Sequence, residues 1–155
     1  MLHEVNFKSF NERDTVYGWI YVPAAKPKGI VQIIHGFGEH SRRYLHMIVK
    51  FIDAGYIVAA DDHVGHGKTA LENNTLTNLV KEKYPNLPYF LFGHSMGSMI
   101  ARDYIAKYGN ELNGVTLCGT CGVFRHAEEG AATLKKLLDE EKGKEADPNI
   151  TGSPM

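Results

Sequence analysis

The sequence lacks the features that mark three large classes of protein. Its two cysteines, Cys118 and Cys121, are too few for the disulfide framework of a small secreted domain. Its 17 Lys and Arg residues nearly balance its 18 Asp and Glu residues, so the net charge of −1 provides no basic field for nucleic acid or an anionic membrane. No apolar run approaches the roughly 18 residues of a membrane span, and the polar first segment, MLHEVNFKSFNERD, has no apolar centre of the kind found in signal peptides. We therefore expect a cytoplasmic protein with no nucleic-acid partner and no stable membrane insertion.

The sequence does contain an alternation of short apolar runs with segments of helical spacing. Hydrophobic residues make up 43% of its 155 residues, which is enough for one domain with a core. The turn NERD between the first two runs predicts an antiparallel hairpin, and the later alternation predicts a mostly parallel sheet with helices on both faces, an α/β fold. Strands are predicted within 2–10, 15–23, 30–34, 56–62, 88–93 and 114–119, and helices within 42–56, 76–84, 96–109 and 126–142.

The segment GHSMG, residues 93–97, fits the pattern G-x-S-x-G, in which a serine stands on a sharp turn between a strand and a helix. The apolar run PYFLF precedes it and the helical pattern MIARDYIAKY follows it, as this role requires. Gly93 and Gly97 remove Cβ atoms that would clash in so crowded a turn. We interpret Ser95, which follows His94, as a catalytic nucleophile, and the N–H of Met96 as a donor to a developing oxyanion at the start of the helix.

A second oxyanion donor is expected from the loop after an earlier buried strand. The loop HGFGEH, residues 35–40, follows the strand predicted at 30–34. His35, Gly36 and Gly38 supply the fixed letters of an H-G-x-G pattern in the place that this role requires. A simple glycine turn at the end of a strand is the alternative interpretation.

Three segments in this order resemble the α/β-hydrolase family: HGFGEHSRRY, AGYIVAADDHVGHGKT and YPNLPYFLFGHSMGSMIARDYI. The resemblance covers residues 15–120 in round figures, and it is closest to the monoacylglycerol lipase, lysophospholipase and serine aminopeptidase branch. It implies the α/β-hydrolase fold, Ser95 as the nucleophile, and the backbone N–H groups of Phe37 and Met96 as the oxyanion hole. It also implies hydrolysis of carboxylic esters, often acylglycerols or lysophospholipids, without a metal or cofactor, and a mobile helical cap after residues 114–119.

Two members of the family's catalytic triad have no matching position in this chain. In the family the order is Ser, then Asp or Glu, then His, and the acid and the histidine each follow a later strand. No strand-like run follows Cys118, and none of the acids beyond it follows a buried strand: Glu128, Glu129, Asp139, Glu140, Glu141, Glu145 and Asp147. The triad acid and histidine therefore stay unassigned. The candidates for a base are His35, His63, His66, His94 and His126.

The spacing of the motifs also differs from the family and likewise indicates that sequence is missing. Only 25 residues separate Gly67 from Gly93, and the helix predicted at 76–84 is shorter than its counterpart in the family, which indicates missing sequence. Residues 1–122 are predicted to be the N-terminal part of a hydrolase core that is incomplete on its C-terminal side. Residues 123–155 are predicted to be the start of the cap and a disordered tail. The strand at 114–119 would then be an exposed sheet edge, through which copies of the chain can associate.

Other motifs give weaker signals. The C-x-x-C spacing of Cys118 and Cys121 ends a strand rather than opening a helix, so we interpret both as half-buried structural residues. His63 and His66 lie in a glycine-containing loop with only Asp61 and Asp62 as possible further ligands, which does not favour a metal site. The segment GHGKT lacks the first glycine of a phosphate-binding loop.

Two functions follow from these patterns. The first is a serine hydrolase that acts on a small-molecule ester or lipid through an acyl-enzyme on Ser95. The second is a truncated, inactive hydrolase fragment that serves only as a binding or interaction module.

Overall fold

The computed structural model describes residues 1–9, 12–63, 69–122 and 127–139. The chain divides into two compact units, Met1–Thr120 and Cys121–Met155. His66, His126 and the tail predicted to be disordered, 140–155, lie outside the described residues.

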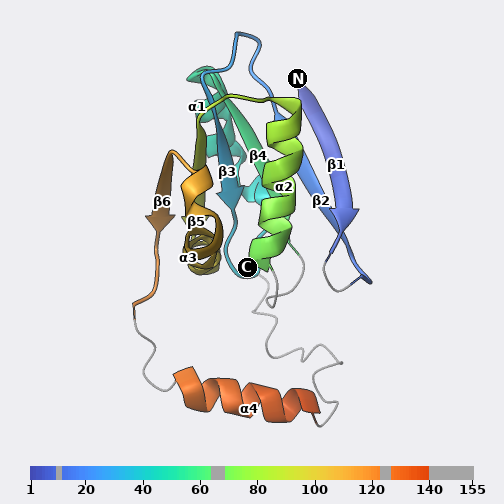
Figure 1. Ribbon diagram of the computed structural model, residues 1–155, viewed down its shortest axis with the longest axis vertical. Coiled ribbons are helices and arrows are strands. Elements are labelled where there is room, and N and C mark those ends of the chain that lie inside the picture. The colour runs from blue at the N-terminus through green and yellow to red at the C-terminus, as the bar shows by residue number, and fades with distance from the viewer. Residues whose placement is uncertain (10–11, 64–68, 123–126, 140–155) are drawn as a thin grey trace. The chain divides into compact units, whose positions relative to one another are not determined.

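One mixed sheet of six strands forms the centre of the first unit (Figure 1). The strands lie in the order β1-β2-β4-β3-β5-β6, and the first two form an antiparallel hairpin. β2 is also antiparallel to β4, whereas β3 is parallel to β4 and β5, and β5 is parallel to β6. The predicted parallel sheet with an N-terminal hairpin is therefore confirmed. The bounds are β1 Leu2–Lys8, β2 Thr15–Tyr21, β3 Gly29–Ile34, β4 Tyr56–Asp62, β5 Tyr89–His94 and β6 Gly114–Cys118.

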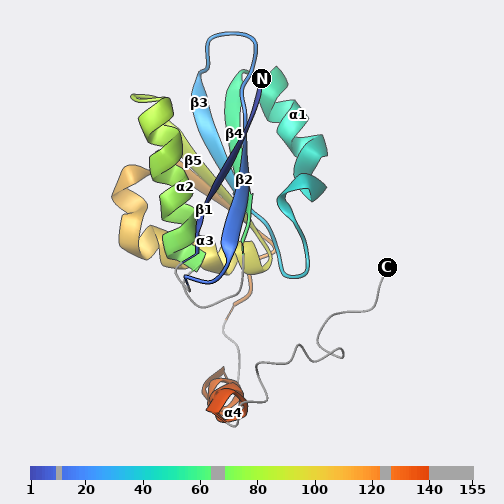
Figure 2. The same ribbon diagram turned by 90° about the vertical axis from the view of Figure 1, so that its right-hand side faces the viewer.

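Helices cover both faces of this sheet (Figure 2). A short 3-10 helix, η1 (Ser41–Tyr44), leads into α1 (Leu45–Asp53) on one face. On the other face lie α2 (Thr69–Lys83) and α3 (Met96–Tyr108), and the 3-10 helix η2 (Gly109–Glu111) follows α3. The predicted doubly covered sheet is confirmed.

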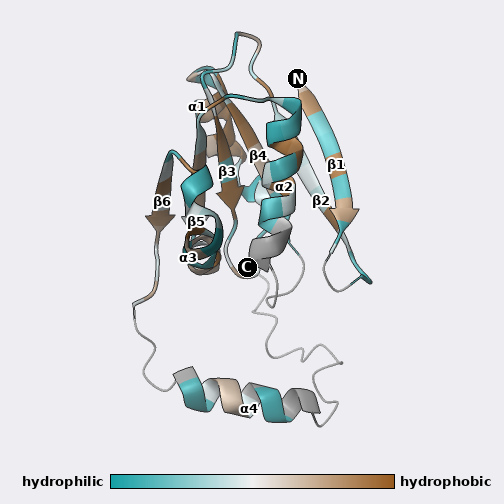
Figure 3. Ribbon diagram, viewed as in Figure 1, coloured by the Kyte–Doolittle hydropathy of each residue, from teal (hydrophilic) through white to brown (hydrophobic). Residues whose placement is uncertain are grey.

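The core consists of two layers because successive side chains of a strand point to opposite faces. All six residues of β3 are buried. Val31 and Ile33 pack with Ile48 of α1, whereas Ile30 packs with α2 and Ile34 packs with α3. Figure 3 shows β3 as strongly hydrophobic, while β1 carries several hydrophilic residues.

The helix α2 begins seven residues before the predicted start at Leu76. Leu76 and Val80 are buried as expected, but the inward face continues toward the N-terminus with Asn73 and Thr77, which are also fully buried. Both side chains form hydrogen bonds with Gln32 in the middle of β3: Asn73 Oδ1 accepts from it and the Thr77 hydroxyl donates to it. A prediction from apolar spacing began the helix too late because part of the buried face is polar.

The strand β6 lies at one edge of the sheet and pairs, within the described residues, with β5 alone. Four of its five residues are exposed. Cys118 and Cys121 are both exposed, so the prediction that they are half-buried was wrong. The reason is that no described helix or strand covers the outer edge of β6.

The described part of the second unit is one helix, α4 (Ala127–Asp139), within the predicted range 126–142. Glu128 and Glu129 occupy its first turn, where their charges suit the helix dipole. Among the described residues, no helix is long and apolar enough to cross a membrane.

Candidate active site

Ser95 stands between the end of β5 and the first residue of α3, with φ 52° and ψ −119°. A Cβ atom on Gly93 would lie 2.5 Å from the carbonyl oxygen of Gly97, and one on Gly97 would collide with the carbonyl oxygens of Ile34 and His35. Both glycines are therefore required by the close approach of β3, β5 and α3. The sequence pattern predicted this sharp strand-to-helix turn, and the structure contains it.

The conformation of Ser95 is strained because a side chain at positive φ crowds the backbone, at a cost of about 1–2 kcal/mol. Replacing Ser95 with Gly should therefore raise the free energy of unfolding by about 1 kcal/mol, after the extra entropy lost by glycine. Ser95→Ala is the matched control, since it removes the same hydroxyl but keeps the Cβ atom. Urea unfolding followed by circular dichroism measures both, and equal midpoints for the Gly and Ala variants would contradict the strain.

Backbone and side-chain hydrogen bonds hold Ser95 in place. Its N–H donates to the carbonyl oxygen of Cys118 on β6 at 2.9 Å. Its own carbonyl oxygen accepts from the N–H of Ser98 at 2.9 Å and from the Oγ of Ser98 at 2.5 Å. Ser98 is fully buried in the first turn of α3. Sequence analysis missed this contribution of Ser98, whose hydroxyl bonds back to the carbonyl group three residues earlier.

The loop after β3 lies against this turn. A Cβ atom on Gly36 would be 3.3 Å from the Cβ of Ser95, so the backbone of the loop approaches the serine closely. Gly38 has φ +66°, which favours glycine. The Phe37 side chain between them is 54% exposed. Met96 opens α3, where backbone N–H groups have no partner within the helix. The structure therefore brings the loop 35–38, Ser95 and the start of α3 together.

Glu39 follows this loop, and sequence analysis missed its role. Its Oε2 accepts hydrogen bonds from the N–H of Gly36 at 3.0 Å and from the hydroxyl of Tyr44 at 2.6 Å. Its Oε1 lies 3.3 Å from Nε of Arg43. The Tyr44 oxygen is also 2.9 Å from Nδ1 of His94, the residue before the serine. These four side chains line a pocket of about 310 Å³.

The contacts of Glu39 decide its charge. Burial on its own raises the pKa of the carboxyl group, but the hydrogen bonds from Tyr44, Gly36 and His94 outweigh burial and lower the pKa below the ordinary value of 4.5. A lowered pKa in the folded state means that the carboxylate stabilises the fold above pH 4.5, and that this contribution is lost as the pH falls through the lowered value. Glu39 is thus a carboxylate at neutral pH.

The histidines considered as bases are placed elsewhere. His35 is buried, with its Nδ1 2.8 Å from the carbonyl oxygen of Gly36 and its ring stacked on that of His63 at 3.6 Å. Burial lowers the pKa of His35, so its ring is neutral at pH 7. His94 is engaged with Tyr44. Among the described residues, no histidine forms a hydrogen bond with the Ser95 hydroxyl, and no group of three or more His, Cys, Asp or Glu residues could hold a metal ion.

Comparison with known proteins agrees with this architecture. The family described as "Serine aminopeptidase, S33" matches residues 25–144. A monoacylglycerol lipase of Mycolicibacterium smegmatis is 34% identical over 113 residues, which cover 64% of this chain and 40% of that protein. Human monoglyceride lipase is 30% identical over 146 residues, which cover 86% of this chain and 47% of that protein.

Solved structures give the same result. A thermostable carboxyl esterase from Bacillus coagulans, in complex with glycerol, is 53% identical with a TM-score of 0.86. The match covers 96% of this chain and 54% of that one, so the chain spans about half the length of the relatives that it matches. The resemblance noted in the sequence is confirmed, and the chain belongs to the serine aminopeptidase S33 family of α/β-hydrolases.

Proposed function

We propose that the protein takes part in the hydrolysis of carboxylic esters, with Ser95 as the nucleophile. The observation that carries the proposal is the strained turn at Ser95, which raises a serine between β5 and α3 beside the loop 35–38. A backbone that maintains such a conformation costs stability, and strain of this kind is concentrated at functional sites. The names of the relatives, monoacylglycerol lipase and carboxyl esterase, support an acylglycerol or another small ester or lipid as the substrate class.

The proposed reaction has two stages. Ser95 Oγ attacks the carbonyl carbon, the carbonyl π electrons move to oxygen, and the serine proton passes to a base. The N–H groups of Phe37 and Met96 stabilise the oxyanion until the alcohol leaves with a proton and an acyl-enzyme remains. Water then attacks the acyl-enzyme and releases the acid. The base and its acid partner are unassigned, because the described residues place no histidine on the serine hydroxyl.

The test is covalent labelling with a fluorophosphonate, which reacts with an activated serine and releases fluoride. We expect labelling of the folded protein at Ser95, identified by mass spectrometry of the modified peptide, and none in Ser95→Ala. Removing a nucleophile costs orders of magnitude in rate. Absence of labelling in folded wild-type protein would overturn the proposal and favour the alternative function, an inactive binding module.

The edge strand β6 supports a second, separate part of the proposal, which is association of two copies through this edge. Val115 and Leu117 are each 36% exposed on β6, and an open edge offers unpaired backbone groups to another strand. Gel filtration before labelling separates the species, so that monomer and dimer are labelled individually. A single monomeric peak over the whole concentration range would remove this part without affecting the role of Ser95.

A further inference from the structure

The carboxylate of Glu39 connects the two segments that the proposed reaction needs to hold together. On one side it accepts the N–H of Gly36, one residue before Phe37. On the other side it accepts the hydroxyl of Tyr44, which reaches His94, one residue before Ser95. The Glu39 side chain is 17% exposed, so these contacts are shielded from competition by water.

The direction of each hydrogen bond in this chain follows from the chemistry of the groups. An ionised carboxylate only accepts, so the single hydroxyl proton of Tyr44 is donated to Glu39 at 2.6 Å. The Tyr44 oxygen then acts as the acceptor toward His94, and Nδ1 of His94 must carry the proton at 2.9 Å. Arg43 lies 3.3 Å from the other carboxylate oxygen and forms an ion pair with Glu39.

The loop approaches Ser95 through Gly36, which has no side chain that could hold the two segments together. Gly38 follows in the same loop, and a Cβ atom built on it would meet no heavy atom within 4 Å. A loop that contains two glycines has a large conformational freedom to lose. Oxyanion donors must lie within about 2.7–3.1 Å of the oxygen that they stabilise, and a misplacement of about 1 Å can cost about 100-fold in rate. The hydrogen bonds of Glu39 with Gly36 and Tyr44 oppose this freedom.

We propose that Glu39 and Tyr44 are positioning residues for ester hydrolysis, which tie the loop of Phe37 to the turn of Ser95 through His94. Neither side chain touches the reacting atoms in this proposal. Their role is to keep the N–H groups of Phe37 and Met96 facing the same oxygen. The inference rests on the proposed function, since it assigns a purpose to a network that the hydrolase site contains.

The experiment compares two conservative variants with a matched control. Tyr44→Phe removes only the hydroxyl between Glu39 and His94, and Glu39→Gln removes the charge while keeping one acceptor oxygen. Tyr56→Phe is the control, because Tyr56 packs on the same face of the sheet as Tyr44 and the removal of its hydroxyl leaves this network intact. We expect the fluorophosphonate labelling rate, normalised to the folded fraction, to fall about 10-fold in each test variant and to stay unchanged in the control.

A kinetic split separates positioning from general destabilisation. With a soluble ester, kcat should fall while KM stays constant, because the oxyanion contacts strengthen in the transition state. If the fluorophosphonate labels the wild type, and Tyr44→Phe reacts with it as fast as the control Tyr56→Phe, the inference is overturned. The same result for Glu39→Gln would overturn it for the carboxylate.

Nuclear magnetic resonance distinguishes failure of this inference from failure of the proposed function. We expect the His94 ring to carry its proton on Nδ1 in the wild type. Because Nδ1 also lies 3.5 Å from Glu39 Oε2, we expect the ring to lose that preference when Tyr44→Phe is combined with Glu39→Gln. We also expect the Gly36 amide to exchange with solvent faster in Glu39→Gln. If the fluorophosphonate does not react with the wild type but the variants show both spectroscopic changes, the hydrolase proposal is overturned and the restraint on the loop is upheld. Unchanged His94 and Gly36 signals in the variants would overturn the restraint itself.

Discussion

Replacing Gly97 with Ala is expected to destabilise the protein by about 3 kcal/mol, a large part of the total stability of a small domain. The new Cβ atom would collide with the carbonyl oxygens of Ile34 and His35. Both are backbone atoms at the end of β3, so no flexible side chain can move aside. The start of α3 must shift away from the sheet, and Ser95 must shift with it. Labelling of Ser95 by a fluorophosphonate should therefore be lost together with the stability.

The matched control for Gly97→Ala lies at the other end of the same helix. A Cβ atom on Gly109 would meet only the Ile105 side chain, at 3.2 Å, and Ile105 is exposed enough to change rotamer. Gly109 also has a helical φ of −58°. Gly109→Ala should thus change the free energy of unfolding by less than about 1 kcal/mol. Equal midpoints for the two variants in urea would mean that α3 does not pack on β3 as closely as the structure shows.

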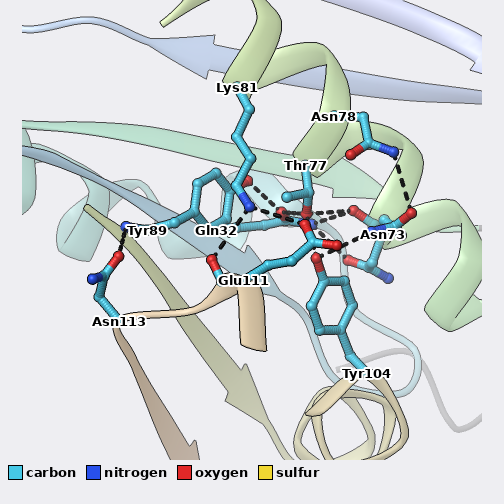
Figure 4. A network of polar contacts seen from close by, with 10 residues as sticks. Gln32, Asn73, Thr77, Asn78, Lys81, Tyr89, Tyr104, Glu111 and Asn113 are labelled. Carbon is cyan, nitrogen blue, oxygen red and sulfur yellow. Dashed lines mark hydrogen bonds and ion pairs between the residues drawn. The ribbon is translucent and has the colours of Figure 1, made fainter. Parts of the chain in front are cut away.

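Replacing Gln32 with Leu is expected to cost about 3 kcal/mol, although leucine is apolar and of similar size. Gln32 is fully buried in β3, and Figure 4 shows its side chain at the centre of a polar network beneath α2. Its Nε2 donates to the backbone oxygen of Asn73 at 3.0 Å, and its Oε1 accepts from Thr77 at 2.7 Å and from the Tyr89 hydroxyl at 2.6 Å. Leucine has no polar atoms in its side chain, so all of these hydrogen bonds would be lost together.

The cost arises from the polar groups that stay behind. The Tyr89 hydroxyl is buried and would lose its acceptor, and the side-chain oxygen of the buried Asn73 would lose the Gln32 donor. Each buried group left without a partner costs about 1–3 kcal/mol. Chemical unfolding measures the loss. Tyr89→Phe combined with Gln32→Leu should recover part of it, because the hydroxyl that lost its acceptor is removed.

A surface pair provides the control for the network. Asn78 donates to Asn74 at 3.2 Å on the exposed side of α2. Asn78→Ala should change stability by less than about 0.5 kcal/mol. If Gln32→Leu were as mild as Asn78→Ala, the network would contribute nothing to the position of α2.

Much of the fold could be predicted from local patterns. The apolar runs that become β3, β4 and β5 are recognisable because a buried strand needs apolar side chains on both faces. The turn at Ser95 was predictable because its geometry admits only glycine at Gly93 and Gly97, which leaves a fixed trace in the sequence. The start of α2 was not, because Asn73 and Thr77 face inward and a buried polar face has no apolar period.

The sequence by itself determined the alternation of strands and helices, the sharp turn at Ser95 and membership of the α/β-hydrolase family, since each depends on residues that are close together in the chain. Only the tertiary structure decided that Glu39 and Tyr44 meet His94, 50 residues after Tyr44, and that Gln32 bonds to Asn73, 41 residues away. Contacts of this kind depend on which strands are neighbours in the sheet. A single sequence carries no periodic signal for that choice, because it results from the packing of the whole core.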